Sequence, residues 1–297
     1  METSETGCGS MSNLLWFLGL VLISLWLFYI THKKTDFRFN LAVYFFTMGL
    51  SFLMEYIVLI LGDAYSYYPN FFSVHWYDNV FGSSISQAFF IPSVLMVIAA
   101  FRIPLKWIIF IIACIYGIEE LFLWLGIYEH NWWKSWFTPV ILFGAVYVIK
   151  WWRSKVEDPS FYIQFMTVYM ASTTIFQGIS FGLTSVVGTH HYKIGWFESP
   201  FRDHVAFSVL IWIIYALLLS VVIIKYYRIK WLSLLFFADT AFHFIMIKLG
   251  ILKVSSLWNP IFFSVILLLL LMLIRKLNNY MFPSCNYKNI KDSSKMP

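Results

Sequence analysis

The stretch LKWIIFIIACIYGIEELFLWLG, residues 105–126, decides the class of fold. Its only lysine stands at the start, and its only acidic residues are two adjacent glutamates in the second half. A hydrocarbon core of about 30 Å needs about 20 apolar residues in a helix. The stretch therefore predicts a transmembrane helix, and the glutamates inside it need an explanation of their own.

Similar apolar segments lie on both sides of this stretch and predict an all-α polytopic transmembrane helix bundle of about nine helices. The expected spans are 13–31, 40–62, 80–101, 105–126, 137–152, 161–188, 205–225, 230–250 and 259–275. Of the 297 residues, 60% are hydrophobic and 12% are charged, whereas soluble domains contain roughly 25% charged residues. The lipid bilayer is therefore the expected partner.

Positive charges predict the orientation of the chain. The first apolar segment follows an acidic start and is followed at once by Lys33 and Lys34, which is typical of an anchor that exports its own N-terminus. If the loops alternate from there, sixteen of the 21 lysine and arginine residues lie in the cytoplasm. We therefore expect a multi-pass protein of the cell membrane with its N-terminus outside and its C-terminus inside. The same rule explains the net charge of +6 without a nucleic-acid partner.

Glycines recur at the predicted outer ends of the even-numbered helices and indicate an internal repeat. They are Gly62, Gly126, Gly188 and Gly250, at intervals of 64, 62 and 62 residues. The motif Leu125-Gly126-Ile127 also recurs as Leu249-Gly250-Ile251. We predict two tandem four-helix units of the same topology, preceded by one added helix. The expected domains are an outer N-terminus and anchor (1–35), two membrane units (36–157 and 158–276) and a basic cytoplasmic tail (277–297).

The segment 77–159 resembles a family of small uncharacterised polytopic membrane proteins of endospore-forming bacteria. The residues that carry the resemblance are Asp78, the helix 89–101, Ile118-Glu119-Glu120, Leu125-Gly126-Ile127-Tyr128, Asn131-Trp132-Trp133 and Trp152-Arg153. The resemblance covers a third to a half of the chain and weakens in the second unit, where Asp239 and His243 replace the acidic pair. It implies a multi-helix inner-membrane fold and no established activity.

Ionisable side chains inside the predicted spans are the candidate functional residues, because a charge at membrane depth costs about 2.5–3.5 kcal/mol. They are Glu55, Glu119, Glu120, Asp239 and His243. Glu55, Glu119 and His243 each lie seven residues before one of the glycines, so their depths should be similar, roughly 10 Å inside the outer boundary. One interpretation is a shared cavity for an ion, a proton or a polar solute. The other is that each group is hydrogen-bonded and only fixes helix packing.

Small and polar residues mark the third and sixth predicted helices. Gly178 and Gly182 form a GxxxG pair, which favours close helix packing, while Ser83 and Gln87 are candidates for packing or for a polar pathway. Asp78 and Asp203 precede the third and seventh predicted helices, where N-capping is the expected role.

Motifs for soluble enzyme chemistry do not appear in the sequence. The three cysteines have no metal-ligand or disulfide spacing, and no phosphate-binding loop or nucleophile elbow occurs, so we predict no metal, no cofactor and no catalytic residue. Transport or permeation of an ion or small polar solute through an intramembrane acidic site is the favoured hypothesis. A membrane-embedded enzyme acting on a lipid or isoprenoid and a non-catalytic envelope sensor or assembly factor are the alternatives. The oligomeric state is left open.

Overall fold

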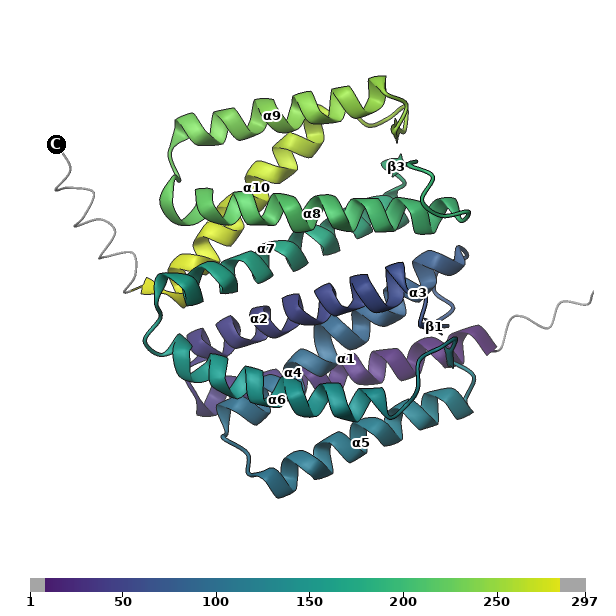
Figure 1. The fold of residues 1–297 in the computed structure, drawn as a ribbon, viewed down its shortest axis with the longest axis vertical. Helices are drawn as coiled ribbons and strands as arrows, with labels where there is room; N and C mark the ends of the chain where they lie inside the picture. Colours follow the sequence, from purple (N-terminus) through teal and green to yellow (C-terminus); the bar gives the residue numbers. More distant parts are fainter. Residues whose placement is uncertain (1–8, 284–297) are drawn as a thin grey trace, which may run out of the picture. The chain divides into compact units, whose positions relative to one another are not determined.

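The computed structural model describes residues 9–283 of the chain. This part forms nine continuous helices, and three of them include a π-helical segment, denoted η. Figure 1 shows the arrangement of the helices within each part of the chain. In chain order they are α1 (Gly9–Lys34), α2 with η1 (Phe37–Glu55 and Tyr56–Leu61), α3 with η2 and α4 (His75–Ser84, Ile85–Phe90 and Ile91–Ala100), α5 (Leu105–Trp124), α6 (Phe137–Val156), α7 with η3 (Phe161–Gly182 and Leu183–Val187), α8 (Pro200–Lys225), α9 (Ile229–Lys248) and α10 (Ile261–Met281). The expected all-α bundle is confirmed.

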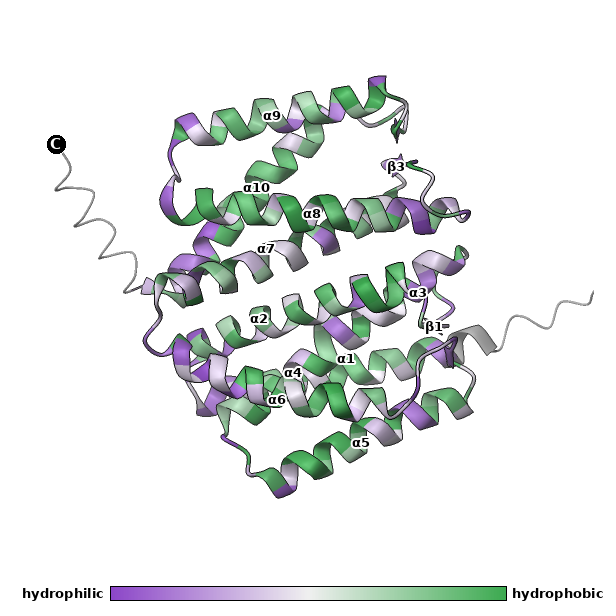
Figure 2. Cartoon of the chain, in the orientation of Figure 1, coloured by the Kyte–Doolittle hydropathy of each residue, from purple (hydrophilic) through white to green (hydrophobic). Residues whose placement is uncertain are grey.

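Eight of these nine helices in residues 9–283 are long and apolar enough to cross a membrane. The ninth, α6, has the length, but Lys150 and Arg153 near its end lower its apolar character. Figure 2 shows hydrophobic residues along the helices and hydrophilic residues gathered towards their ends and in the loops. The chain is therefore a multi-pass integral membrane protein.

The chain divides into two compact units, Met1–Glu157 (unit 1) and Asp158–Pro297 (unit 2). In unit 1, α4 packs against α1, α2 and α6, while α5 packs against α6 (Figure 1). The core of unit 2 lies between α7, α8 and α10 and includes Phe176, Leu219, Ile223 and Leu271. The added helix α1 thus belongs to unit 1, where Phe17 is fully buried.

Each unit contains one short two-stranded antiparallel sheet, whose strands come from loops that are far apart in sequence. Strand β1 (Tyr65–Tyr67) pairs with β2 (Tyr128–His130), and β3 (His190–Tyr192) pairs with β4 (Leu252–Val254). The Tyr67 amide donates to Asn79 Oδ1 at 2.9 Å, and the Tyr192 amide donates to His204 Nδ1 at 3.0 Å. In both units a side chain of the helix that follows the first strand, α3 or α8, therefore fixes the two-stranded sheet. We did not predict these strands, because three residues are too few to show a strand period.

The predicted helix-ending glycines have a conformational role in three of four cases. The φ angles of Gly126, Gly188 and Gly250 are +67°, +69° and +74°, in the left-handed region that favours glycine. Gly62 instead has φ −91°, and the next residue, Asp63, takes φ +51°. At Gly62 the close approach of the backbone favours glycine, since a Cβ there would lie 2.7 Å from the Val58 carbonyl oxygen.

The predicted N-capping role of Asp78 and Asp203 is wrong. Helices α3 and α8 begin at His75 and Pro200, so both aspartates lie in the first turn rather than before it. Asp78 accepts hydrogen bonds from the backbone amides of residues 70, 71 and 72, at 2.9, 2.7 and 2.9 Å. Asp203 accepts from the amides of residues 194, 195 and 196, at 2.7, 2.9 and 2.7 Å. Each carboxylate therefore binds the loop that connects the preceding strand, β1 or β3, to the helix, α3 or α8.

Candidate functional site

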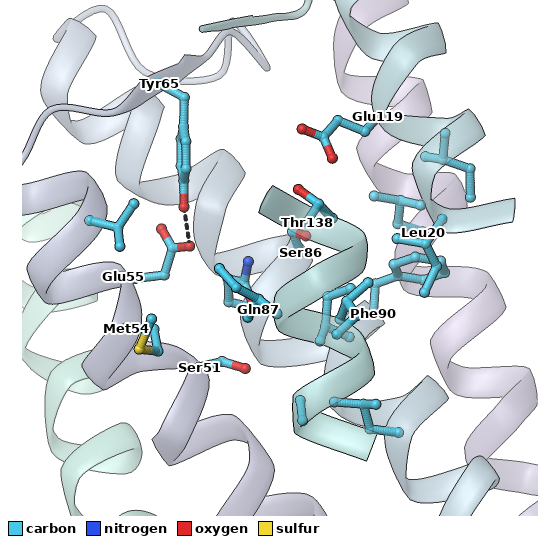
Figure 3. Close-up of a pocket in the computed structure, with 18 of the residues that line it drawn as sticks. Leu20, Ser51, Met54, Glu55, Tyr65, Ser86, Gln87, Phe90, Glu119 and Thr138 are labelled. Atoms are coloured by element: carbon cyan, nitrogen blue, oxygen red, sulfur yellow. Dashed lines mark hydrogen bonds between the residues drawn. The ribbon is translucent and has the colours of Figure 1, made fainter. Parts of the chain in front are cut away.

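A cavity of about 190 Å³ lies inside unit 1, next to the β1–β2 sheet (Figure 3). Its walls come from α1, α2, η2, α4, α5 and α6, and most of its lining residues are apolar. Two carboxylates line it, Glu55 from α2 and Glu119 from α5. The cavity exceeds the roughly 150 Å³ that holds a benzene molecule in an engineered protein core. It can therefore accommodate a small organic molecule.

Glu55 is 8% exposed and is surrounded by neutral hydrogen-bond donors. The Tyr65 hydroxyl donates to one carboxylate oxygen, and the Ser83 hydroxyl donates to the other at 2.6 Å. The Gln87 side chain also hydrogen-bonds to Glu55. Figure 3 shows Tyr65 pointing from its strand directly at this carboxylate. Ser83 and Gln87 thus hold Glu55 in place.

Glu119 enters the same space from the other side of the cavity (Figure 3). One of its oxygens lies 3.1 Å from His130 Nε2, and its side chain also hydrogen-bonds to Thr138. Glu120 does not line the cavity and instead hydrogen-bonds to Tyr116. Of the predicted acidic pair, only Glu119 is part of the site, because adjacent helical residues point in directions about 100° apart.

Aromatic rings form the wall of the cavity beside the β1–β2 sheet. Tyr65 lies 5.4 Å from both Tyr128 and Trp133 between ring centroids, and Tyr67 stacks on Tyr128 at 4.6 Å. Burial, followed by the negative charge of Glu55, raises the pKa of Tyr65 and of Tyr67 well above the usual range. Both phenols therefore stay protonated and keep the ability to donate hydrogen bonds.

Two π-helical segments border the cavity. Residue Val58 of η1 and residues Ser86, Gln87 and Phe90 of η2 line it. From Asp78 to Lys106 the chain is one residue longer than from Asp203 to Lys230, and α8 has no π-helical segment. The extra residue of unit 1 is accommodated in η2. Such π-bulges frequently occur at functional sites.

Asp239 and His243 lie in unit 2 and form a local polar cluster. Asp239 is 2% exposed and accepts a hydrogen bond from the Ser264 hydroxyl at 2.7 Å. His243 Nδ1 lies 2.8 Å from the Asp239 carbonyl oxygen and 3.4 Å from its carboxylate, and the imidazole stacks on Phe263. Nearby, burial lowers the pKa of His190 in β3 to about 3, so its imidazole is neutral at physiological pH.

The place in unit 2 that corresponds to the unit 1 cavity is filled. The hydroxyl oxygens of Ser180 and Ser208 lie 3.3 Å apart, at the positions that correspond to Glu55 and Ser83 in unit 1. One turn before Ser180 stands Phe176, where unit 1 has Ser51, and nine residues after Asp203 stands Trp212, where unit 1 has Gln87. Phe176 and Trp212 stack with centroids 4.9 Å apart. The remaining space is about 20 Å³, enough for about one water molecule.

The Gly178–Gly182 pair does not mark close packing within unit 2. A Cβ built on either glycine would meet no atom within 4 Å. The tightly packed glycine is Gly82 in α3, where a Cβ would lie 2.6 Å from the Cβ atom of Tyr67. This contact places strand β1 against α3 next to the Glu55 carboxylate.

Sequence reasoning missed the tyrosines, Trp133 and Thr138 as site residues. Tyrosine and tryptophan near helix ends are typical of the membrane interface, and only the strand pairing shows that Tyr65, Tyr67 and Tyr128 face the cavity. Within residues 9–283, no group of three or more histidine, cysteine, aspartate or glutamate side chains could hold a metal ion.

Comparisons of the chain with protein-family models, curated proteins and solved structures found no match. The resemblance to membrane proteins of endospore-forming bacteria therefore stays a prediction. The functional argument rests on the geometry of unit 1.

Proposed function

We propose that the protein transports a small solute across the membrane and binds it in the unit 1 cavity. The observation that carries this proposal is the pair of carboxylates, Glu55 and Glu119, in a largely apolar and aromatic cavity among membrane-spanning helices. Ionisable groups at membrane depth are costly and commonly mark solute or ion pathways. The neutral donors around Glu55 orient the carboxylate without neutralising it by a fixed cation.

The proposed membrane is the cell membrane, with the N-terminus outside and the C-terminus in the cytoplasm. Cys8 and Cys285 lie outside the described residues, one in each terminal segment, and provide a test. In variants that retain only one of them, a membrane-impermeant maleimide applied to intact cells should label Cys8 but not Cys285. After lysis both should be labelled, and labelling of Cys285 in intact cells would reverse the proposed sidedness.

We infer that the two units are copies of one ancestral four-helix unit. The matched strand registers, the hydrogen bond from the first strand to α3 or α8 and the aspartate bonds to the preceding loop support this inference. In this view unit 1 kept or acquired the open site, while Phe176 and Trp212 closed the corresponding place in unit 2. The proposed transport then depends on one binding site in the chain.

Substitution of either cavity carboxylate tests the transport proposal. In proteoliposomes that contain the purified protein, concentration jumps of protons, Na⁺, K⁺ and small organic solutes should produce a current or an uptake signal for at least one of them. Glu55→Gln and Glu119→Gln should each reduce it by about tenfold or more, because a hydrogen bond to a charged group contributes about 1.5–3 kcal/mol.

Glu120→Gln is the matched control, because it removes an adjacent carboxylate of the same helix that does not line the cavity. It should leave the transport rate within about twofold of the wild type, a difference of about 0.4 kcal/mol. Equal losses in Glu119→Gln and Glu120→Gln would contradict a role for the cavity. Conversion of a co-purified lipid without any flux would favour a membrane-embedded enzyme instead.

A further inference from the structure

We propose that the ligand of the unit 1 cavity is a small organic cation, an ammonium group on an apolar body. This inference rests on the proposed binding role of the cavity and specifies the chemical class of its ligand. It follows from three features of the lining: its charge, its aromatic rings and its apolar walls.

The charge of the lining is negative. Glu55 and Glu119 both line the cavity, and none of the described lining residues is lysine or arginine. The side-chain partners of Glu55 are the neutral groups of Tyr65, Ser83 and Gln87. The Glu119 carboxylate already has the His130 imidazole 3.1 Å away. Charged groups buried in protein are stable only when paired, so a positively charged ligand would give Glu55 the partner that its neutral neighbours do not. An anionic ligand would meet two carboxylates at close range.

The aromatic rings favour an ammonium group over a neutral polar group. Four aromatic residues line the cavity on the side of the β1–β2 sheet, namely Tyr65, Tyr67, Tyr128 and Trp133. A cation within about 6 Å of an aromatic centroid is attracted by the electron-rich ring face. Aromatic ring faces are the usual recognition elements for substituted ammonium ions, and the two carboxylates add opposite charge.

The apolar walls favour an organic cation over an inorganic ion. Apolar side chains make up most of the lining and include Leu20, Met54, Phe90, Ile91 and Leu95. A hydrated metal ion prefers six or more oxygen ligands, which these side chains do not offer. A hydrocarbon body, in contrast, gains free energy from burial against them. The volume of about 190 Å³ sets the size at a single ring with a short side chain.

Three probes of nearly equal size and different charge test this assignment. Benzylamine, benzyl alcohol and benzoate are measured by equilibrium dialysis on the full-length protein in nanodiscs, with empty nanodiscs subtracted. Benzylamine should bind at least about tenfold more tightly than benzyl alcohol, and benzoate should bind more weakly still. Glu55→Gln and Glu119→Gln should each weaken benzylamine binding about tenfold, with benzyl alcohol changed less than about twofold. Glu120→Gln should change neither.

The outcomes separate the ligand class from the proposed site. Ser51→Phe combined with Gln87→Trp fills the cavity with two aromatic rings. If benzyl alcohol or benzoate binds as tightly as benzylamine, and this filled variant loses that binding, the cation assignment is wrong and the cavity remains the binding site. If filling the cavity changes the binding of none of the three probes, both the ligand class and the proposed site are overturned.

Discussion

Ser51→Phe combined with Gln87→Trp should abolish solute binding and transport while the protein still folds. The two substitutions place in unit 1 the aromatic rings that occupy the corresponding space in unit 2, where Phe176 and Trp212 stack 4.9 Å apart. The cavity of about 190 Å³ offers space for the added ring atoms. We expect transport to fall to background, and thermal melting in detergent should show that the variant keeps its fold.

The reciprocal exchange in unit 2 is the matched control. Phe176→Ser with Trp212→Gln removes two large side chains from the unit 2 core and should destabilise the protein, because a buried aromatic truncation costs about 3–5 kcal/mol. Transport normalised to folded protein should not change, since the unit 1 cavity is untouched. Ser51→Phe alone serves if the double variant of unit 1 does not fold. A filled, well-folded unit 1 with wild-type transport would refute the proposed site.

Asp78→Ala should destabilise unit 1 by about 3 kcal/mol or more. Asp78 is 3% exposed and is the acceptor for three backbone amides of the loop before α3. Each buried donor left without an acceptor costs about 1–3 kcal/mol. Thermal unfolding in detergent should show the loss, and hydrogen exchange should increase first at the amides of residues 70–72.

Two further variants make this result interpretable. Asp78→Asn keeps one acceptor oxygen and should retain part of the stability. Glu129→Ala removes an exposed acid of strand β2 in the same unit and should cost less than about 1 kcal/mol. Asp203→Ala should reproduce the effect in unit 2, because Asp203 binds three amides in the same way. A melting temperature of Asp78→Ala equal to that of Glu129→Ala would show that the loop does not need the carboxylate.

Helix positions could be predicted because apolar length is a local property. The predicted span 105–126 and helix α5 (Leu105–Trp124) begin at the same residue, and the predicted 40–62 lies close to Phe37–Leu61. The third and seventh helices begin five residues earlier than predicted, at His75 and Pro200. Their first turns carry polar residues that a hydropathy pattern excludes. The structure shows that Asp78 and Asp203 bind the preceding loops and that Ser199 caps α8 by accepting from the Arg202 amide.

By itself the sequence determined membrane residence, the approximate limits of each helix and the acidic residues that needed a partner. The tertiary structure decided which of them share a site: Glu55 and Glu119 face one cavity, Glu120 points away, and Asp239 with His243 lies in unit 2. It also showed that Tyr65, Tyr67 and Tyr128, which the sequence places at the membrane interface, line the cavity. The physical reason is that hydrophobic length acts within one helix, whereas convergence depends on how helices rotate and pack against each other.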